Sequence, residues 1–302
     1  MKNKILYNIL IGLLTLLACL PLKVLYILSD IGTVIIYYIV RYRRKTVRHN
    51  LLLVFPDKSI REIKKIEFKF YRHFCDCIVE TVKLLHISYK EIDRRVKVNN
   101  GNLIEQIAES NRPIVLFLGH YCNWEWVQAI SRQYKYPKIN GEIYRPVHDP
   151  VMDKIMLKIR SKFGHILIPQ KKAVRTILAL KNTNESFMIG FISDQRPNSS
   201  NLNHWTIFLN QETAYSAGGE EIGKKINAEY VYLDIEKVKR GYYEMTFKIV
   251  TPQEGDEKYP YTLQFMQMME TTILRAPEYW LWSHKRWRFS KQDILNKQQQ
   301  IK

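Results

Sequence analysis

The local pattern that decides the fold is clearest in residues 114–126, "IVLFLGHYCNWEW". The first five residues are apolar, so we expect a buried β-strand over 114–118. Gly119 then permits a sharp bend, and Asn123 is a favourable N-cap for a helix over 124–134. A strand, a turn and a helix in this order are the building unit of a layered α/β domain.

The same alternation continues along most of the chain. Short apolar runs rich in β-branched residues predict further strands at 139–144, 165–169, 187–193, 205–209, 230–235 and 244–250. Helical patterns separate most of these runs, at 149–163, 171–181, 213–226 and 258–275, and a long amphipathic helix over 59–85 precedes them. This order predicts an α/β fold with a layered, mostly parallel sheet flanked by helices.

The N-terminus has the composition of a membrane anchor. Residues 5–20 carry no charge, and a second apolar stretch over 24–40 is interrupted only by Asp30. Five basic residues follow within 41–48, as is typical of the cytoplasmic flank of a membrane segment. A cleaved signal peptide fits poorly, because the apolar character continues past Lys23. A buried N-terminal hairpin of a soluble protein stays open, as does whether 24–40 spans the bilayer or lies along it.

We therefore expect three parts. These are a membrane-anchoring helical segment with its basic flank over 1–45, a cytosolic-face domain over 46–290, and a polar tail over 291–302.

The net charge indicates which kinds of partner to expect, and the cysteine content indicates the redox state of the thiols. The 302 residues are 46% hydrophobic and carry a formal net charge of +18, which favours an anionic partner such as an acidic protein or anionic lipid. The basic residues are spread along the chain without a recognition motif, so we do not expect nucleic acid binding. The four cysteines contain no C-x-x-C pair, and reduced thiols are the simplest interpretation.

His120 and Glu125 are the first candidates for chemistry. They cannot meet on one continuous helix, but they can if His120 lies in the turn and Glu125 in the first helical turn. A carboxylate beside an imidazole fixes its tautomer and stabilises the imidazolium, which suits His120 as a general base. A metal site is disfavoured, because only Cys122 could join these two residues as a local ligand. A purely structural histidine is the remaining alternative.

Three more polar residues follow other predicted strands. Arg145 comes after 139–144, and Asp194 and Arg196 come after 187–193. If the strands are parallel, their carboxyl ends share one edge, and these residues open onto one crevice with His120. Guanidinium groups in that crevice suit anionic oxygens, although a surface salt bridge is the ordinary role of any single arginine.

Several motifs together resemble a known family. "GHYCNWE" looks like the H-x-x-x-x-[DE] motif of the glycerolipid acyltransferase superfamily. With "YRPVHDPVMDKI", "SDQR" and "PEYWLWSHKRWRF", the chain resembles the late lipid A biosynthesis acyltransferases, the lauroyl and myristoyl transferases, over nearly its whole length.

The resemblance implies acyl transfer at the cytoplasmic side of the cell inner membrane. The donor would be an acyl-carrier-protein thioester and the acceptor a hydroxyl of an anionic membrane glycolipid, a lipid A precursor, with no cofactor. His120 would be the base and Glu125 would orient it. Arg145 and Arg196 would hold acceptor phosphates or the phosphopantetheine, and Asp194 would help to arrange that wall.

Alternatives remain at this level. The acceptor could be an aminolipid or another glycolipid, and the donor a coenzyme A thioester. A serine hydrolase would use Ser216 in "AYSAG", near the G-x-S-x-G elbow, with Asp234 or Asp256 and His284 following in order. The C-terminal Trp280 and Trp282 predict either a membrane-interface patch or core packing; if the segment is a strand, both lie on one face with His284.

Overall fold

The computed structural model describes residues 2–183, 185–198, 202–252, 255 and 257–294. The first half contains α1 (Lys2–Cys19), α2 (Leu22–Val34), the π-helix η1 (Ile35–Val40), α3 (Arg44–Val54), α4 (Ile60–Lys83), α5 (Tyr89–Arg95), β1 (Val96–Val98), α6 (Gly101–Glu109), β2 (Ile114–Leu118), η2 (Trp124–Arg132) and β3 (Ile139–Tyr144). The second half contains α7 (Pro150–Arg160), β4 (Ile166–Pro169), η3 (Gln170–Lys172), α8 (Ala173–Lys181), β5 (Phe187–Ile192), β6 (His204–Phe208), β7 (Gln211–Tyr215), α9 (Gly218–Ile226), β8 (Glu229–Lys239), β9 (Tyr242–Ile249), α10 (Pro260–Arg275) and η4 (Pro277–Tyr279).

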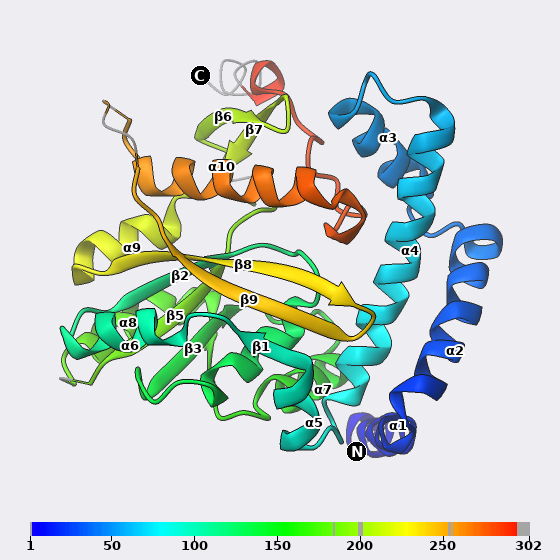
Figure 1. The fold of residues 1–302 in the computed structure, drawn as a ribbon, viewed down its shortest axis with the longest axis horizontal. Coiled ribbons are helices and arrows are strands. Elements are labelled where there is room, and N and C mark those ends of the chain that lie inside the picture. Colours follow the sequence, from blue (N-terminus) through cyan, green and yellow to red (C-terminus); the bar gives the residue numbers. More distant parts are fainter. Residues whose placement is uncertain (1, 184, 199–201, 253–254, 256, 295–302) are drawn as a thin grey trace.

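A seven-stranded sheet lies at the centre, in the order β1-β9-β8-β2-β5-β3-β4 (Figure 1). Every neighbouring pair is parallel except β8 and β9, which form an antiparallel hairpin. β2, β5 and β3 are adjacent, and β2 is buried along its entire length, as its continuous apolar run predicts. The predicted α/β fold with a mostly parallel sheet is confirmed.

Around residue 210 the predicted strand is present but lies outside the central sheet, and the predicted start of the following helix was wrong. The strand expected at 205–209 is β6, but it pairs only with β7 in a separate antiparallel hairpin. The helix expected from residue 213 begins only at Gly218, because residues 211–215 form β7. Leu209 and Asn210, between the two strands, both have positive φ, the backbone that a tight two-residue hairpin turn requires.

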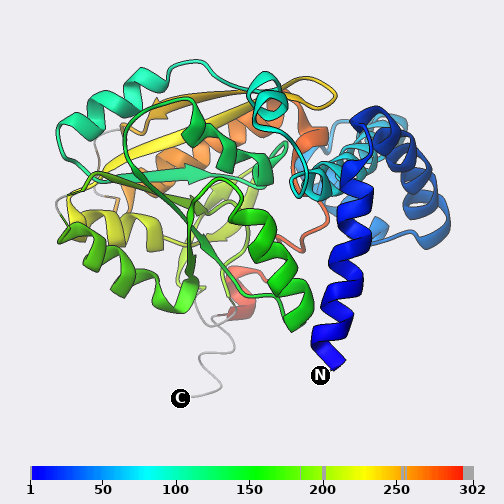
Figure 2. The same cartoon turned by 90° about the horizontal axis from the view of Figure 1, so that it is seen from below.

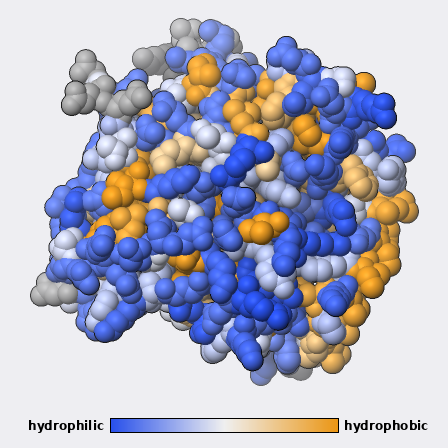
Figure 3. Space-filling model, in the orientation of Figure 1, coloured by the Kyte–Doolittle hydropathy of each residue, from blue (hydrophilic) through white to orange (hydrophobic). Residues whose placement is uncertain are grey.

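The N-terminal helices expose an unusually apolar surface. The uncharged stretch 5–20 lies in α1 and is followed by a break at Pro21. Within the described part of the chain, the helical stretch Leu22–Val40 is the one long and apolar enough to cross a membrane. Exposed large apolar side chains cover both helices, including Ile5, Ile9, Leu13, Leu16, Ile27, Ile31, Val34 and Ile39. Figure 2 shows α1 lying beside α7 at the edge of the molecule, and Figure 3 shows the apolar area that follows the N-terminal helices.

Polar contacts join α2 to the rest of the chain. Asp30 of α2 and Asp76 of α4 share the guanidinium of Arg240, which lies in the β8–β9 turn, at 2.8 and 2.6 Å. Tyr26 donates a hydrogen bond of 2.7 Å to the fully buried Glu80 of α4. These contacts hold one side of α2 against the domain and leave its apolar side exposed. Of the expected polar tail, residues 295–302 lie outside the described part of the chain.

Candidate active site

His120 lies just beyond the carboxyl end of β2, as the sequence predicts. The preceding Gly119 is closely packed: a Cβ there would lie 2.5 Å from Cε at the flexible end of Met269 and 3.3 Å from Cγ of Asp194. The glycine therefore lets the turn approach α10 and the loop after β5. Asn123 caps the next helix through Oδ1, which accepts from the backbone N–H of Trp126 at 3.1 Å, although this helix is 3-10 rather than α.

The carboxylate that orients His120 is Asp194. Its Oδ1 accepts from Nδ1 of His120 at 2.8 Å, and its Oδ2 accepts from the His120 backbone N–H at 3.0 Å and from Nε1 of Trp280 at 2.7 Å. Asp194 is 1% exposed. Burial alone would raise its pKa, but the imidazole of His120 and the three hydrogen bonds outweigh burial and lower it. Because an ionised carboxylate only accepts, Nδ1 is the donor in this hydrogen bond, so in the neutral imidazole the free lone pair lies on Nε2.

The expectation that Glu125 orients His120 was wrong. Arg160 of α7 binds both carboxyl oxygens of Glu125, at 2.6 and 3.0 Å, in a bidentate pair. The 3-10 helix η2 places Glu125 in the wall beside α7. His120 instead contacts the ring of Trp124, with 5.3 Å between ring centroids. The two predicted catalytic residues thus lie in one site, but each has its own partner.

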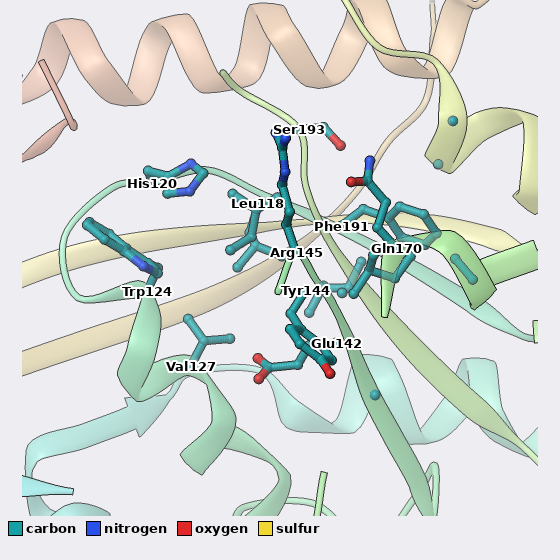
Figure 4. Close-up of a pocket in the computed structure, with 18 of the residues that line it drawn as sticks. Leu118, His120, Trp124, Val127, Glu142, Tyr144, Arg145, Gln170, Phe191 and Ser193 are labelled. Atoms are coloured by element: carbon teal, nitrogen blue, oxygen red, sulfur yellow. The ribbon is translucent and has the colours of Figure 1, made fainter. Parts of the chain in front are cut away.

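A cavity of about 530 Å³ opens beside His120. Figure 4 shows His120, Trp124 and Val127 on one side, Glu142 below them, and Phe191 and Gln170 on the other side. Its apolar lining comes mainly from β2, η2, β3, β5, α8 and α9: Leu116, Leu118, Val127, Ile130, Ile143, Val174, Met188, Phe191 and Ile222. A volume of this size with largely apolar walls fits a small amphiphile or a fatty chain.

Arg145 and Arg196 line the same cavity as His120 and Glu125, as predicted, whereas Asp194 is not among the residues that line it. Arg145 is exposed at the cavity and donates to Oδ1 of Asn198 at 3.0 Å. Nε and Nη1 of Arg196 are buried without a hydrogen-bond partner in the described part of the chain. Burial, together with the charge of Arg288, lowers the pKa of Arg196. Asp194 instead contacts the imidazole of His120 through its Oδ1.

Comparison with known proteins shows the family to which the chain belongs. The family model described as "Bacterial lipid A biosynthesis acyltransferase" matches residues 2–289. The chain belongs to this family. It is similar to the Escherichia coli (strain K12) lipid A biosynthesis lauroyltransferase, with 25% identity over 92% of this chain and 90% of the relative. It is also 23% identical to the palmitoleoyltransferase of that strain and to the lipid A biosynthesis acyltransferase of Shigella flexneri, over 92% of this chain and 89% of each relative.

The family that the sequence motifs indicated is thereby confirmed, and the family consists of acyltransferases of lipid A biosynthesis. The structure does not bring Ser216, Asp234 and His284 into the arrangement that a serine hydrolase would need. Ser216 directly follows β7 and lines the cavity, but β7 is not part of the central sheet. Asp234 pairs with Arg275 and Lys248, and Nδ1 of His284 is buried without a hydrogen-bond partner among the described residues. Asp256 lies outside the described residues.

The C-terminal tryptophans of this lipid A acyltransferase family member belong to the core. Trp280 and Trp282 are 1% and 0% exposed, and their rings meet edge to face at 4.7 Å. The segment is not a strand beyond a single bridge between Tyr121 and Trp280. Core packing was therefore the correct alternative, and the sequence did not reveal that Trp280 also binds Asp194.

No group of three or more His, Cys, Asp or Glu side chains in the described residues could hold a metal ion. Cys122 is buried, with its thiol turned toward the carbonyl oxygen of Ile235 at 3.9 Å. Burial raises the pKa of this thiol well above its usual range, which leaves it a poor nucleophile and a poor metal ligand.

Proposed function

We propose that this protein transfers a fatty acyl chain from an acyl-carrier-protein thioester to a hydroxyl of a membrane glycolipid, a lipid A precursor. The observation that carries the proposal is the His120–Asp194 hydrogen bond at a largely apolar cavity. That arrangement supplies a base of fixed tautomer beside room for a chain. Membership of the lipid A biosynthesis acyltransferase family supports the same reaction class.

In the proposed mechanism, Nε2 of His120 accepts the proton of the acceptor hydroxyl as its oxygen attacks the thioester carbonyl carbon. The new C–O bond forms, the C–S bond breaks, and the imidazolium returns the proton to the leaving thiolate. Asp194 holds the ring in position and stabilises the imidazolium. The acceptor is itself the nucleophile, so the route forms no acyl-enzyme.

Glu125 enters this mechanism through Arg160. The bidentate pair between them fixes a guanidinium at the wall of the cavity that contains His120. We assign Glu125 the role of positioning this guanidinium, in place of the role of orienting His120. Its replacement by glutamine would weaken the pair and leave the His120–Asp194 contact intact.

Arg145 and Arg196 are the proposed anion-binding residues. Unpartnered N–H groups of a buried guanidinium are costly, and an anionic oxygen is their strongest hydrogen-bond partner. Phosphates of the acceptor or of the phosphopantetheine arm would supply such oxygens at the cavity. Arg145 is anchored by Asn198 and would approach the same anion from β3.

The remaining surface suits the proposed partners and location. A net charge of +18 would attract both an acidic carrier protein and an anionic lipid surface. The exposed apolar faces of α1 and α2 would insert into the membrane, with the basic residues of 41–48 at the headgroups on the cytoplasmic side of the inner membrane.

The deciding experiment combines lipid analysis with purified protein. Mass spectrometry of total lipids from cells with and without the protein should reveal one species that differs by one acyl mass, and its headgroup distinguishes a lipid A precursor from an aminolipid. Purified protein should perform the same transfer from acyl carrier protein. His120→Ala should reduce turnover by at least ~10²-fold. Unchanged lipids in the deleted strain, together with no transfer in vitro, would contradict the proposal.

A further inference from the structure

Part of the cavity is an open channel along the face of the sheet that η2 covers. We call this channel, which passes over Gly190 between Leu116 and Glu142, the lane. Gly190 of β5 is level with Leu116 of β2 on one side and with Glu142 of β3 on the other. A Cβ at Gly190 would meet only Leu118 Cδ2 at 3.6 Å and Gly141 O at 3.7 Å, which are ordinary contacts. Packing therefore does not demand a glycine here. Its missing side chain leaves room in the cavity, roughly 7 Å deeper along the strands than Leu118.

Glu142 forms one side of this lane and lacks a partner. Its Oε1 is buried with no hydrogen bond in the part of the chain that the structure describes. The nearby guanidinium of Arg160 is already bound by both oxygens of Glu125. Figure 4 shows the Glu142 carboxyl turned toward the side of the cavity where Val127 lies. A carboxyl without a partner among apolar walls is unfavourable, so this position calls for a ligand with a hydrogen-bond donor.

Gln128 of η2 provides a second free acceptor in the lining of the same cavity. It is 2% exposed, and its Nε2 donates to the backbone oxygen of Glu125 at 3.0 Å. That bond fixes the orientation of the amide and leaves Oε1 buried without a partner among the described residues. Two acceptors without donors thus line a cavity whose other walls here are Leu116, Val127 and Met188.

We propose that Glu142 and Gln128 recognise a hydroxyl group on a fatty chain that runs over Gly190. The hydroxyl donates to one of the two Oε1 atoms, while the methylenes on either side of it contact the apolar walls. A plain hydrocarbon chain in the same lane would leave both acceptors without a partner. This inference rests on the proposed acyl transfer and adds to it a specificity for a chain hydroxyl that is distinct from the hydroxyl that reacts at His120.

The test compares chains of one length with and without a hydroxyl. Full-length protein is assayed with acyl carrier protein loaded with a plain chain or with positional isomers that carry one hydroxyl. At least one isomer should exceed the plain chain about tenfold or more in kcat/KM, the usual effect of a hydrogen bond to a carboxyl group. Glu142→Leu should bring this ratio to about one, and Gln128→Leu should lower it. Glu142→Gln should keep part of it, and the matched control Met188→Leu should leave the ratio unchanged.

A second set of assays identifies whether the fatty chain that occupies the lane belongs to the acyl donor or to the acceptor lipid. With a plain donor, acceptors that differ by one hydroxyl in their own fatty chain are compared in the wild type and in Glu142→Leu. A Glu142-dependent preference in this arm assigns the lane to the acceptor, and one in the first arm assigns it to the donor. The inference is overturned if neither arm shows a preference, or if the preference survives Glu142→Leu in a protein whose thermal unfolding shows that it is folded. Absence of transfer from every donor would instead contradict the proposed function.

Discussion

Replacing Asp194 with asparagine should invert the tautomer of His120. In the wild type, Oδ2 accepts three hydrogen bonds, from the His120 backbone N–H, from Nε1 of Trp280 and from Nε2 of Gln195, while Oδ1 accepts one from Nδ1 of His120. An amide has one oxygen, and it satisfies more donors when it takes the position of Oδ2. The amide N–H₂ then faces Nδ1 and makes it an acceptor, so the proton moves to Nε2.

The size of the effect follows from that inversion. A protonated Nε2 cannot accept the proton of the acceptor hydroxyl, so the base is lost while the fold keeps three of the four hydrogen bonds of residue 194. In a serine protease, the corresponding change of aspartate to asparagine lowers kcat by about 10⁴-fold, and we expect roughly 10³–10⁴ here. The assay is single-turnover transfer from acyl carrier protein, with thermal unfolding as a check that Asp194→Asn is folded.

Glu125→Gln is the matched control, because it also removes one carboxylate charge, from a residue that lines the cavity beside His120. It breaks the bidentate pair with Arg160 and leaves the Asp194 contacts in place. We expect a smaller loss, roughly ten- to a hundred-fold, the scale of one charge-assisted hydrogen bond. If Asp194→Asn retained near wild-type kcat while Glu125→Gln abolished it, the assignment of Asp194 as the orienting group would be refuted.

Three further outcomes are expected. Ser216→Ala should leave turnover nearly unchanged, and loss of activity would revive the hydrolase alternative. Arg145→Ala should raise the KM for a phosphorylated acceptor about ten- to a hundred-fold, and much less for its dephosphorylated analogue; equal losses would remove the anion-binding assignment. Burial and the charge of Glu125 raise the pKa of Glu142 from 4.5 to about 7, against the effect of Arg160. The protonated form is favoured in the fold, so stability is fully present below pH 4.5 and falls by up to about 3 kcal/mol as the pH rises through 7. Unfolding free energies measured across this range should lose that slope in Glu142→Gln, and an identical slope would contradict the assignment.

The common edge of the site was predictable because it depends on local patterns and one topological rule. Apolar runs marked the strands, polar residues followed them, and parallel strands bring their carboxyl ends together. His120, Arg145 and Arg196 accordingly line one cavity. The β6–β7 hairpin was missed because its turn, Leu209 and Asn210, contains no glycine to signal positive φ.

The partner of His120 could not be read from the sequence, because it depends on strand order. Leu118 of β2 is paired with Ile192 of β5, so residues two positions beyond each are level at the sheet edge. Those residues are His120 and Asp194. Strand order is a long-range property, whereas Glu125 lies five residues from His120 and was favoured by proximity alone. Had β2 and β5 been known as neighbours, the same register argument would have selected Asp194.

Two imidazoles stand near this sheet edge, and their surroundings assign them different roles. His284 is followed by the buried Arg286, and burial together with the charges of Arg286 and Arg196 lowers its pKa to about 4. It is therefore uncharged at neutral pH, and no carboxylate in the described part of the chain holds it. Protonating His284 would add a charge beside two guanidinium groups, whereas a proton taken up by His120 is offset by the ionised Asp194. Of these two imidazoles, His120 is the one held by a carboxylate, which is why we propose the base in the segment after β2 rather than in the C-terminal aromatic segment.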